Sequence, residues 1–298
     1  RISGPFGTSG FGAFGIKGRE KTRIGKGTTG MAEIKLIASD IDGTLIKDST
    51  PDLYPEMADA ICRLAKQGIL FCAASGRQYQ SIRNVFREAG ENIIFIAENG
   101  AQIRYKEQDI SVTPMKRKDA EDIVRQLRQY YATCDIIVST ADGSLVESRN
   151  REFIDLITYG YHNKFRQVKD VLEEDAQIIK IAIYQKESIR DLGEGTLIPM
   201  WKDKVKVCMA GEDWVDFMDA SVDKGNALRF LQNYFGITKE ETMAFGDNNN
   251  DIGLMQAAGE SYAVENAREE VKAAAKHICP SYQEKGVYLV VKELLTDG

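Results

Sequence analysis

The chain has 298 residues, 43% of them hydrophobic and 28% charged, and its formal net charge is −6. This length is sufficient for two domains, and the acidic balance argues against a surface for nucleic acid or for an anionic membrane. No apolar run approaches the roughly 20 residues that a membrane-spanning helix requires.

Cysteine and histidine usage narrows the chemistry further. The five cysteines are scattered and form no C-x-x-C pair, which favours free thiols in a reducing compartment and predicts a cytoplasmic protein. The two histidines, His162 and His277, are isolated, which argues against a histidine-rich zinc site and against a serine hydrolase. The sequence therefore favours chemistry based on carboxylates.

The first thirty residues differ in composition from the rest of the chain. Residues 1–30 are rich in Gly, Ser, Thr and Lys and show no periodicity, so we expect a leader foreign to the fold or a disordered extension. Residues 10–15 spell G-x-G-x-x-G, but no predicted strand precedes them and no helix follows. We therefore exclude this segment from the prediction of the fold.

From Met31 the chain alternates short apolar runs with amphipathic stretches. Apolar runs joined by helices predict a parallel sheet that is covered on both faces. The predicted strands are 34–39, 69–75 and 92–100, and the predicted helices are 56–68 and 79–90.

The middle of the chain has a different pattern. Its strands are short and alternate between apolar and polar residues, which favours an antiparallel sheet with one solvated face. The predicted elements are a helix at 118–130, strands at 136–140, 144–148 and 177–184, and the strand runs KVKVCMAG and WVDFMD within 204–219. We therefore expect an inserted α+β cap domain over residues 113–219.

After the insertion the parallel pattern resumes. The predicted elements are a helix at 223–235, a strand at 242–247, a helix at 252–259, a strand at 261–264 and a helix at 267–277. The predicted fold is thus α/β, with a doubly wound, Rossmann-like parallel sheet in a discontinuous core domain, 31–112 and 220–298, into which the cap is inserted.

Four polar clusters stand at the predicted strand ends or helix starts. Since ligands of open α/β sheets bind beyond the carboxyl ends of the strands, we expect these clusters to converge. Taken singly, an Asp or Ser here is often a turn or cap residue and a Lys a solvated charge, but the combination favours a site. The clusters are Asp40-Ile41-Asp42-Gly43-Thr44, Ser75-Gly76-Arg77, Asp223-Lys224-Gly225 and Gly246-Asp247-Asn248-Asn249-Asn250-Asp251.

This combination resembles the haloacid dehalogenase superfamily of phosphohydrolases. The resemblance lies in D-x-D-G-T at 40–44, a serine after the second strand, a lysine that opens a helix, and G-D-x-x-N-D at 246–251. An α/β cap inserted between the second and third motifs resembles the class IIB cap of the Cof-type sugar-phosphate phosphatases, as do residues 97–101 and 263–267. Residues 279–283 depart from the Thr- and Asn-rich turn that relatives often carry.

The resemblance implies a Mg²⁺-dependent phosphatase that hydrolyses small phosphate monoesters, such as sugar phosphates, through an aspartyl-phosphate. It assigns Asp40 as the nucleophile and Asp42 as the general acid/base, with Lys224 as a further catalytic residue. The implied phosphate-binding residues are Ile41, Ser75, Gly76, Lys224 and Asn250, and the implied metal ligands are Asp40, Asp42 through its carbonyl, Asp247, Asn248 and Asp251, the last two directly or through water.

These roles are consistent with the physics of the motif. Two neighbouring carboxylates repel each other, and a phosphate dianion beside them adds to the repulsion, whereas Mg²⁺ binds oxygen ligands of both kinds. Asp40 and Asp42 are two positions apart, so they share one face of an extended strand and reach the same substrate.

Alternatives and partners complete the sequence-based predictions. The same residues could serve a phosphosugar mutase or phosphotransferase, or a non-catalytic module that binds Mg²⁺ and phosphate. We expect a small phosphorylated metabolite as partner, no nucleic acid, no membrane, and a monomer or small homo-oligomer. In the cap, a polar and aromatic cluster is either part of the substrate pocket or a cap surface or hinge: Tyr159, Tyr161, His162, Lys164 and Arg166.

Overall fold

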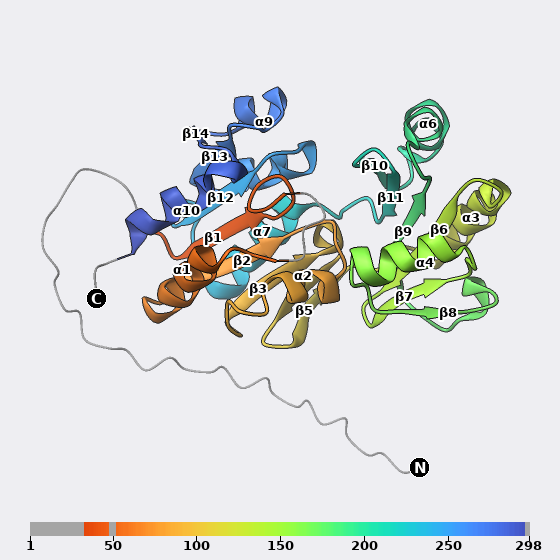
Figure 1. Ribbon diagram of the computed structural model, residues 1–298, viewed down its shortest axis with the longest axis horizontal. Coiled ribbons are helices and arrows are strands. Elements are labelled where there is room, and N and C mark those ends of the chain that lie inside the picture. The colour runs from red at the N-terminus through yellow and green to blue at the C-terminus, as the bar shows by residue number, and fades with distance from the viewer. Residues whose placement is uncertain (1–32, 48–51, 296–298) are drawn as a thin grey trace, which may run out of the picture. The chain divides into compact units, whose positions relative to one another are not determined.

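The computed structural model describes residues 33–47 and 52–295, and the predicted leader at 1–30 lies outside them (Figure 1). Eight strands form one sheet in the order β14-β13-β12-β1-β2-β3-β4-β5. Their bounds are β1 Leu36–Asp40, β2 Leu70–Ala74, β3 Ile93–Ala97, β4 Gln102–Tyr105, β5 Gln108–Val112, β12 Thr242–Gly246, β13 Glu260–Val264 and β14 His277–Cys279.

The strand order explains where a site can form. The six strands from β14 to β3 pair in parallel, while β4 and β5 extend the sheet as antiparallel strands. From β1 the chain runs outward through β2 and β3 on one side, and later through β12, β13 and β14 on the other. The order therefore reverses between β1 and β12, which is the place where such sheets bind ligands.

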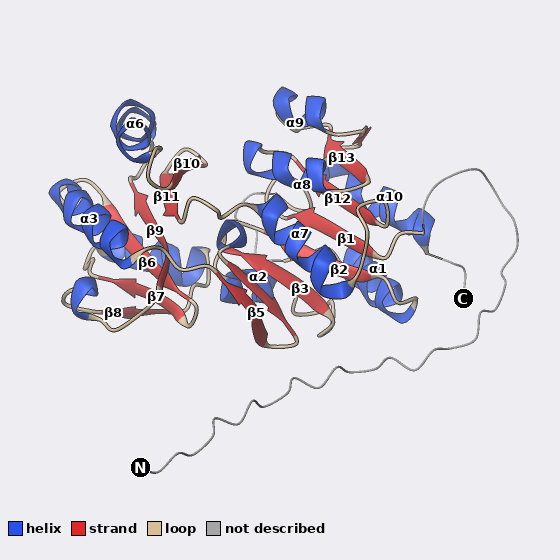
Figure 2. Ribbon diagram, turned by 180° about the vertical axis from the view of Figure 1, so that it is seen from behind, coloured by secondary structure: helices blue, strands red, loops and turns tan. Residues whose placement is uncertain are grey.

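Helices cover this sheet, and right-handed crossovers place those of the two halves on opposite faces (Figures 1 and 2). The first half, β1 to β3, includes α1 Pro55–Lys66 and α2 Tyr79–Val85 between its strands. Helix α10 Gly286–Val291 packs against α1. The second half carries α7 Lys224–Phe235, which packs against α8 Ile252–Ala257, and α9 Glu269–Ala274.

Helix α7 begins at a residue of the predicted site. The side chain of Asp223 accepts hydrogen bonds from the backbone N–H groups of Gly225 and Asn226, and so caps the helix. The helix ends at Phe235 and is capped by Gly236, whose φ of 66° is left-handed. This capped start fixes Lys224 in the first turn, pointing toward the sheet edge.

A second sheet, which we call the cap sheet, lies between β5 and α7 in the chain. It has the order β10-β11-β9-β6-β7-β8 and is antiparallel except for the β7–β8 pair. Its strands are β6 Asp135–Thr140, β7 Gly143–Val146, β8 Phe165–Gln167, β9 Ile178–Tyr184, β10 Lys206–Ala210 and β11 Trp214–Met218, and its helices are α3 Arg117–Leu127, α4 Arg151–Asp155, α5 Arg190–Leu192 and α6 Ile198–Trp201.

The predicted fold class, a doubly wound sheet with an inserted α+β segment, is confirmed. Each sheet has its own apolar core, one around β1, β2 and β12 and one between α3 and the cap sheet. Some boundaries were wrong. The helix predicted at 79–90 ends at Val85, and the one at 267–277 ends at Ala274. Residues 277–279, His-Ile-Cys, instead pair with 262–264, because pairing with the existing sheet outweighs continuation of the helix from the Ala- and Lys-rich residues before them.

Within the described ranges, none of the helices has the length and hydrophobicity that crossing a bilayer requires.

Candidate active site

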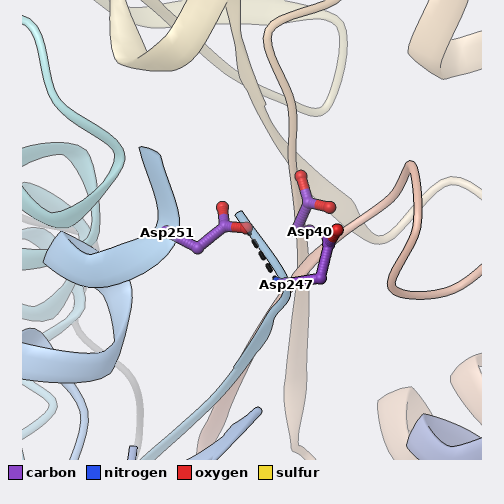
Figure 3. A group of neighbouring side chains, drawn as sticks. All are labelled: Asp40, Asp247 and Asp251. Atoms are coloured by element: carbon purple, nitrogen blue, oxygen red, sulfur yellow. Dashed lines mark hydrogen bonds between the residues drawn. The ribbon is translucent and has the colours of Figure 1, made fainter. Parts of the chain in front are cut away.

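Three carboxylates meet beyond the carboxyl ends of β1 and β12. Asp40 is the last residue of β1, Asp247 follows β12, and Asp251 lies one turn further along the chain. Each offers an oxygen that lies within 4.8 Å of those of the other two (Figure 3). Asp40 and Asp251 are buried. Three acids at this spacing repel one another, so the arrangement requires positive charge.

Lys224 supplies part of that charge. Its ammonium group donates to Asp40 Oδ1 at 2.5 Å and to Asp251 Oδ1 at 2.7 Å, and its side chain is buried. Burial alone would lower the pKa of Lys224, but the attraction of Asp251 and Asp40 outweighs it and raises the pKa. The lysine therefore stays charged and neutralises one of the three carboxylates.

The remaining negative charge affects the pKa values of two of the acids. Burial and the nearby charge of Asp251 raise the pKa of Asp40 well above its ordinary value. The same two causes raise the pKa of Asp247 to about 6. An oxygen-lined cluster with excess negative charge fits a hard divalent cation such as Mg²⁺.

Two residues of the D-x-D-G-T motif position Asp247. The hydroxyl of Thr44 donates to Asp247 Oδ1 at 2.8 Å. Gly43 has a left-handed φ of 82°, and a Cβ at this position would lie 2.6 Å from Asp247 Oδ2. Glycine is therefore required both for the turn and for the space that Asp247 occupies.

The carboxylate of Asp42 is held by Arg77. The guanidinium Nε donates to Asp42 Oδ2 at 2.7 Å and Nη2 donates to Oδ1, so the pair is bidentate. Sequence reasoning quoted Arg77 next to Ser75 but gave it no role. The available signal was the need for a cation near Asp42, which stands two residues after Asp40.

Most of the predicted site residues line one cavity, and Asp251 does not. This cavity has a volume of about 360 Å³. Ile41 and Lys224 do not line it: the Ile41 side chain is fully buried, and Lys224 reaches the site through Asp40. The predicted residues that line the cavity are Asp40, Asp42, Ser75, Gly76, Asp247, Asn248 and Asn250.

The cap sheet forms the opposite wall of the cavity. Tyr161 and Trp214 line it and contact each other edge to face, with ring centroids 5.9 Å apart. The rest of the predicted cap cluster has other surroundings. Tyr159 is 72% exposed, the guanidinium of Arg166 pairs with Glu174, and His162 sits at a positive φ of 53°. The cluster is thus divided between pocket and surface.

Sequence reasoning missed a buried charged group beside the same cavity. Lys180 on β9 and Asp216 on β11 line the cavity with Glu98, and none of the three was assigned a role. One signal was available for Lys180, a single charge inside the apolar run IIKIAIY, 178–184. Such a residue in a buried strand requires buried partners.

Comparison with known proteins agrees with this geometry. Residues 37–291 match the family of haloacid dehalogenase-like hydrolases. A 5-amino-6-(5-phospho-D-ribitylamino)uracil phosphatase of Escherichia coli is 28% identical over 262 residues, which cover 88% of this chain and 96% of that protein.

Solved structures have the same architecture. A protein of Eubacterium rectale is 37% identical, with 88% of this chain and 99% of that one covered, at a TM-score of 0.79. A haloacid dehalogenase-like hydrolase of Bacillus subtilis, 24% identical with 88% and 100% covered, shares the fold at a TM-score of 0.77. The protein described here therefore belongs to the haloacid dehalogenase-like hydrolase family.

Proposed function

We propose that this phosphatase hydrolyses small phosphate monoesters through an aspartyl-phosphate on Asp40, with Mg²⁺ as cofactor. The observation that carries the proposal is the group of Asp40, Asp247, Asp251 and Lys224 at the switch point of the sheet, of which all but the half-buried Asp247 are buried. The group combines a candidate nucleophile, excess negative charge and a fixed ammonium group, and two of its members, Asp40 and Asp247, line a cavity.

The metal site would use the oxygens that remain available. Asp40 and Asp247 would each give a carboxylate oxygen, and Asp42 its backbone carbonyl. Asp251 already accepts from Lys224 and, through Oδ2, from the backbone N–H groups of Asp247 and Asn248 at 3.1 Å. We therefore assign Asp251 a contact through water, and Asn248 a direct or water-mediated one. Bound Mg²⁺ would offset the charge of the acids and of the phosphate.

In the first step, a carboxylate oxygen of Asp40 attacks phosphorus as the bond between phosphorus and the ester oxygen breaks. The leaving alkoxide takes a proton from Asp42, and the product alcohol departs. Since Arg77 occupies both oxygens of Asp42 in this structure, the pair has to open when substrate binds.

In the second step, a water molecule attacks the phosphorus of the aspartyl-phosphate, and Asp42 takes its proton. The bond between phosphorus and Asp40 breaks, which releases inorganic phosphate and restores the carboxylate. Lys224 stays on Asp40 and stabilises the charge that develops on the phosphoryl oxygens.

The remaining phosphoryl oxygens would be bound by hydrogen-bond donors at the sheet edge. These are the Ser75 hydroxyl, the Asn250 amide and the backbone N–H groups of Ile41 and Gly76, with Lys224 as the charged donor. Ser75, Gly76 and Asn250 line the cavity, which supports these roles.

The core and the cap would have different functions in the reaction. We assign the chemistry to a core of residues 31–112 and 220–298, and selection of the leaving group to a cap of residues 113–219. The Escherichia coli relative is named for a phosphorylated ribitylaminouracil. The aromatic wall of Tyr161 and Trp214 could accept the face of such a ring. The five free cysteines favour a reducing, cytoplasmic location.

Phosphate release from a panel of sugar, nucleotide and cofactor phosphates tests the proposal, with added Mg²⁺, with chelator, and with the Asp40→Asn variant as blank. We expect release that needs Mg²⁺ and Asp40. Conversion of a hexose phosphate to its isomer without phosphate release would instead identify a mutase, and full activity in chelator would contradict the metal requirement.

A further inference from the structure

Lys180 is a buried cation at the cavity wall that the mechanism above does not use. It lies on β9 of the cap sheet and is only 8% exposed. Its ammonium group forms an ion pair with Glu98, lies 3.3 Å from Asp216 Oδ2, and donates to the carbonyl oxygen of Gly76 at 2.7 Å. Both acids are buried as well. Burying three charges is costly unless they are paired, so the arrangement calls for an explanation.

The cluster keeps Lys180 charged. Burial alone would lower the pKa of Lys180, but attraction from Asp216 and Glu98 outweighs it and raises the pKa. Burial also raises the pKa of Asp216, an effect that the charge of Lys180 partly offsets. The ammonium group is therefore a fixed, strong hydrogen-bond donor to a backbone carbonyl of the sheet edge.

That carbonyl belongs to the loop that carries Ser75. The backbone N–H of Asn99 donates to the Ser75 carbonyl at 2.9 Å, and the N–H of Glu98 donates to the Arg77 carbonyl at 3.0 Å. The carbonyl between them, of Gly76, is the one that the cap lysine holds. All three carbonyls of the loop thus have donors, and the middle donor comes from the cap sheet.

Fixing the Gly76 carbonyl also fixes the next N–H group. A peptide unit is planar and trans, so the N–H of Arg77 points away from the Gly76 oxygen. This N–H donates to Ser75 Oγ at 3.1 Å. The Ser75 oxygen thus accepts a bond within the loop, and its own proton can be donated to a ligand. Arg77, whose N–H belongs to this peptide unit, also binds Asp42 through its guanidinium group.

The turn beneath the loop is held from both sheets. Glu98 and Asn99 have left-handed φ values of 50° and 58°, which are uncommon for a residue such as Glu and are tolerated better by Asn. The Asn99 amide donates to Asp216 Oδ2 at 3.2 Å, and its oxygen accepts from Asn250 at 3.0 Å. The strained turn therefore links an acid of the cap sheet to a proposed phosphate ligand.

We propose that Lys180 is a positioning residue for phosphate, because its ammonium group sets the 76–77 peptide unit, whose Arg77 N–H holds Ser75 Oγ so that the Ser75 hydroxyl faces the phosphoryl group. This inference rests on the proposed function. It adds that the cap completes the phosphate-binding loop and does more than select the leaving group. If the cap moves away from the core, the Gly76 carbonyl loses the hydrogen bond from Lys180.

The experiment measures the affinity of the full-length protein for inorganic phosphate in Mg²⁺ by calorimetry, together with kcat and KM for p-nitrophenyl phosphate. Lys180→Met removes the donor, and Lys180→Arg restores charge and N–H groups. Lys186→Met is the control: it breaks another ion pair of the cap, from Lys186 to Glu152 at 3.0 Å, without contact to the loop or the cavity. Thermal unfolding of each variant monitors the fold.

We expect Lys180→Met to weaken phosphate binding at least about tenfold and to lower kcat/KM about 100-fold, with partial recovery in Lys180→Arg and near wild-type values in Lys186→Met. If Lys180→Met fails to fold, the neutral triple variant Lys180→Met, Glu98→Gln, Asp216→Asn takes its place with the same expectation. Phosphate binding within about threefold of wild type in the folded variant overturns the inference. A wild-type protein that neither binds phosphate nor hydrolyses the ester overturns the proposed function as well, which separates the two failures.

Discussion

At the scale of single residues, the site depends on charge compensation around Asp40. Asp40, Asp247 and Asp251 carry more negative charge than Lys224 can offset, and the raised pKa values of Asp40 and Asp247 reflect this. The metal-free protein therefore holds unfavourable electrostatic energy at neutral pH. Removing one charge should stabilise it while destroying its function.

Asp40→Asn tests this conflict between stability and activity. The substitution keeps the side-chain shape but removes the nucleophile and one buried charge. We expect turnover to fall by more than about 1,000-fold, and the melting temperature in chelator to rise by a few degrees. Phosphate release and differential scanning fluorimetry measure the two effects. Appreciable turnover by the variant would show that Asp40 is not the nucleophile.

The raised pKa of Asp247 predicts a pH dependence of stability. The folded, metal-free protein binds a proton at Asp247 up to about pH 6, whereas the unfolded chain releases it near pH 4. Its contribution therefore favours the folded state at low pH and is lost as the pH rises through this window. The Asp247→Asn variant has no ionisable group at this position. In chelator, its free energy of unfolding relative to that of wild type should therefore increase by about 1–2 kcal/mol between pH 4 and pH 7.

Urea unfolding at several pH values measures this difference. The advantage of Asp247→Asn should disappear when Mg²⁺ is added to wild type, because the cation compensates the carboxylate. A stability difference that stays constant from pH 4 to pH 7 would mean that Asp247 titrates normally and that the cluster is not strained.

The residues of the site differ in how far the sequence could identify them. The structure places Asp40, Asp42, Ser75, Asp247 and Asn250 around one cavity, and local motifs had singled them out. Lys180, Glu98 and Asp216 come from three separate strands or turns, and no spacing in the chain relates them. Their proximity arises from the packing of the two sheets, which a sequence pattern does not encode.

At the scale of elements, the turn after β1 fixes the geometry of the acids. Gly43 is left-handed, and its missing side chain leaves room for Asp247. Gly43→Ala should cost about 1–2 kcal/mol through the backbone conformation and displace the carboxylate as well, so both stability and apparent Mg²⁺ affinity should fall.

Gly68→Ala is the control for this prediction. Gly68 has a similar φ of 84°, but no heavy atom lies within 4 Å of a Cβ placed there. Gly68→Ala should lose a similar amount of stability to Gly43→Ala, while its activity stays near that of wild type. Equal losses of activity in the two variants would show that the contact with Asp247 is not what matters.

Some helices and strands could be predicted from the sequence pattern and others could not. The buried strand β1 and the capped helix α7 were predicted to within one or two residues, since burial and capping are local signals. Strands β8 and β14 were missed because each has three residues and is extended only by pairing with a neighbour. The turn at 98–100 was predicted as strand, although tertiary contacts impose left-handed backbone there.

At the scale of the whole molecule, the cavity lies between residues of both sheets, so substrate selection should depend on which cap residues face it. Tyr161 lines the cavity, whereas Arg166 pairs with Glu174 on the surface. We expect Tyr161→Ala to change kcat/KM unequally among phosphate esters, least for the smallest, and Arg166→Ala to leave the pattern unchanged. A substrate panel run on both variants tests this, and one common factor for all esters would contradict it.

The central claim is that phosphate passes through Asp40. The most direct measurement is borohydride trapping of the phosphoenzyme, formed from acetyl phosphate and Mg²⁺ in the Asp42→Asn variant, which lacks the base for the second step. Borohydride reduces an aspartyl-phosphate to homoserine, so peptide mass spectrometry should find homoserine at position 40 and at no other aspartate. Homoserine elsewhere, or none in an enzyme that hydrolyses acetyl phosphate, would contradict the account.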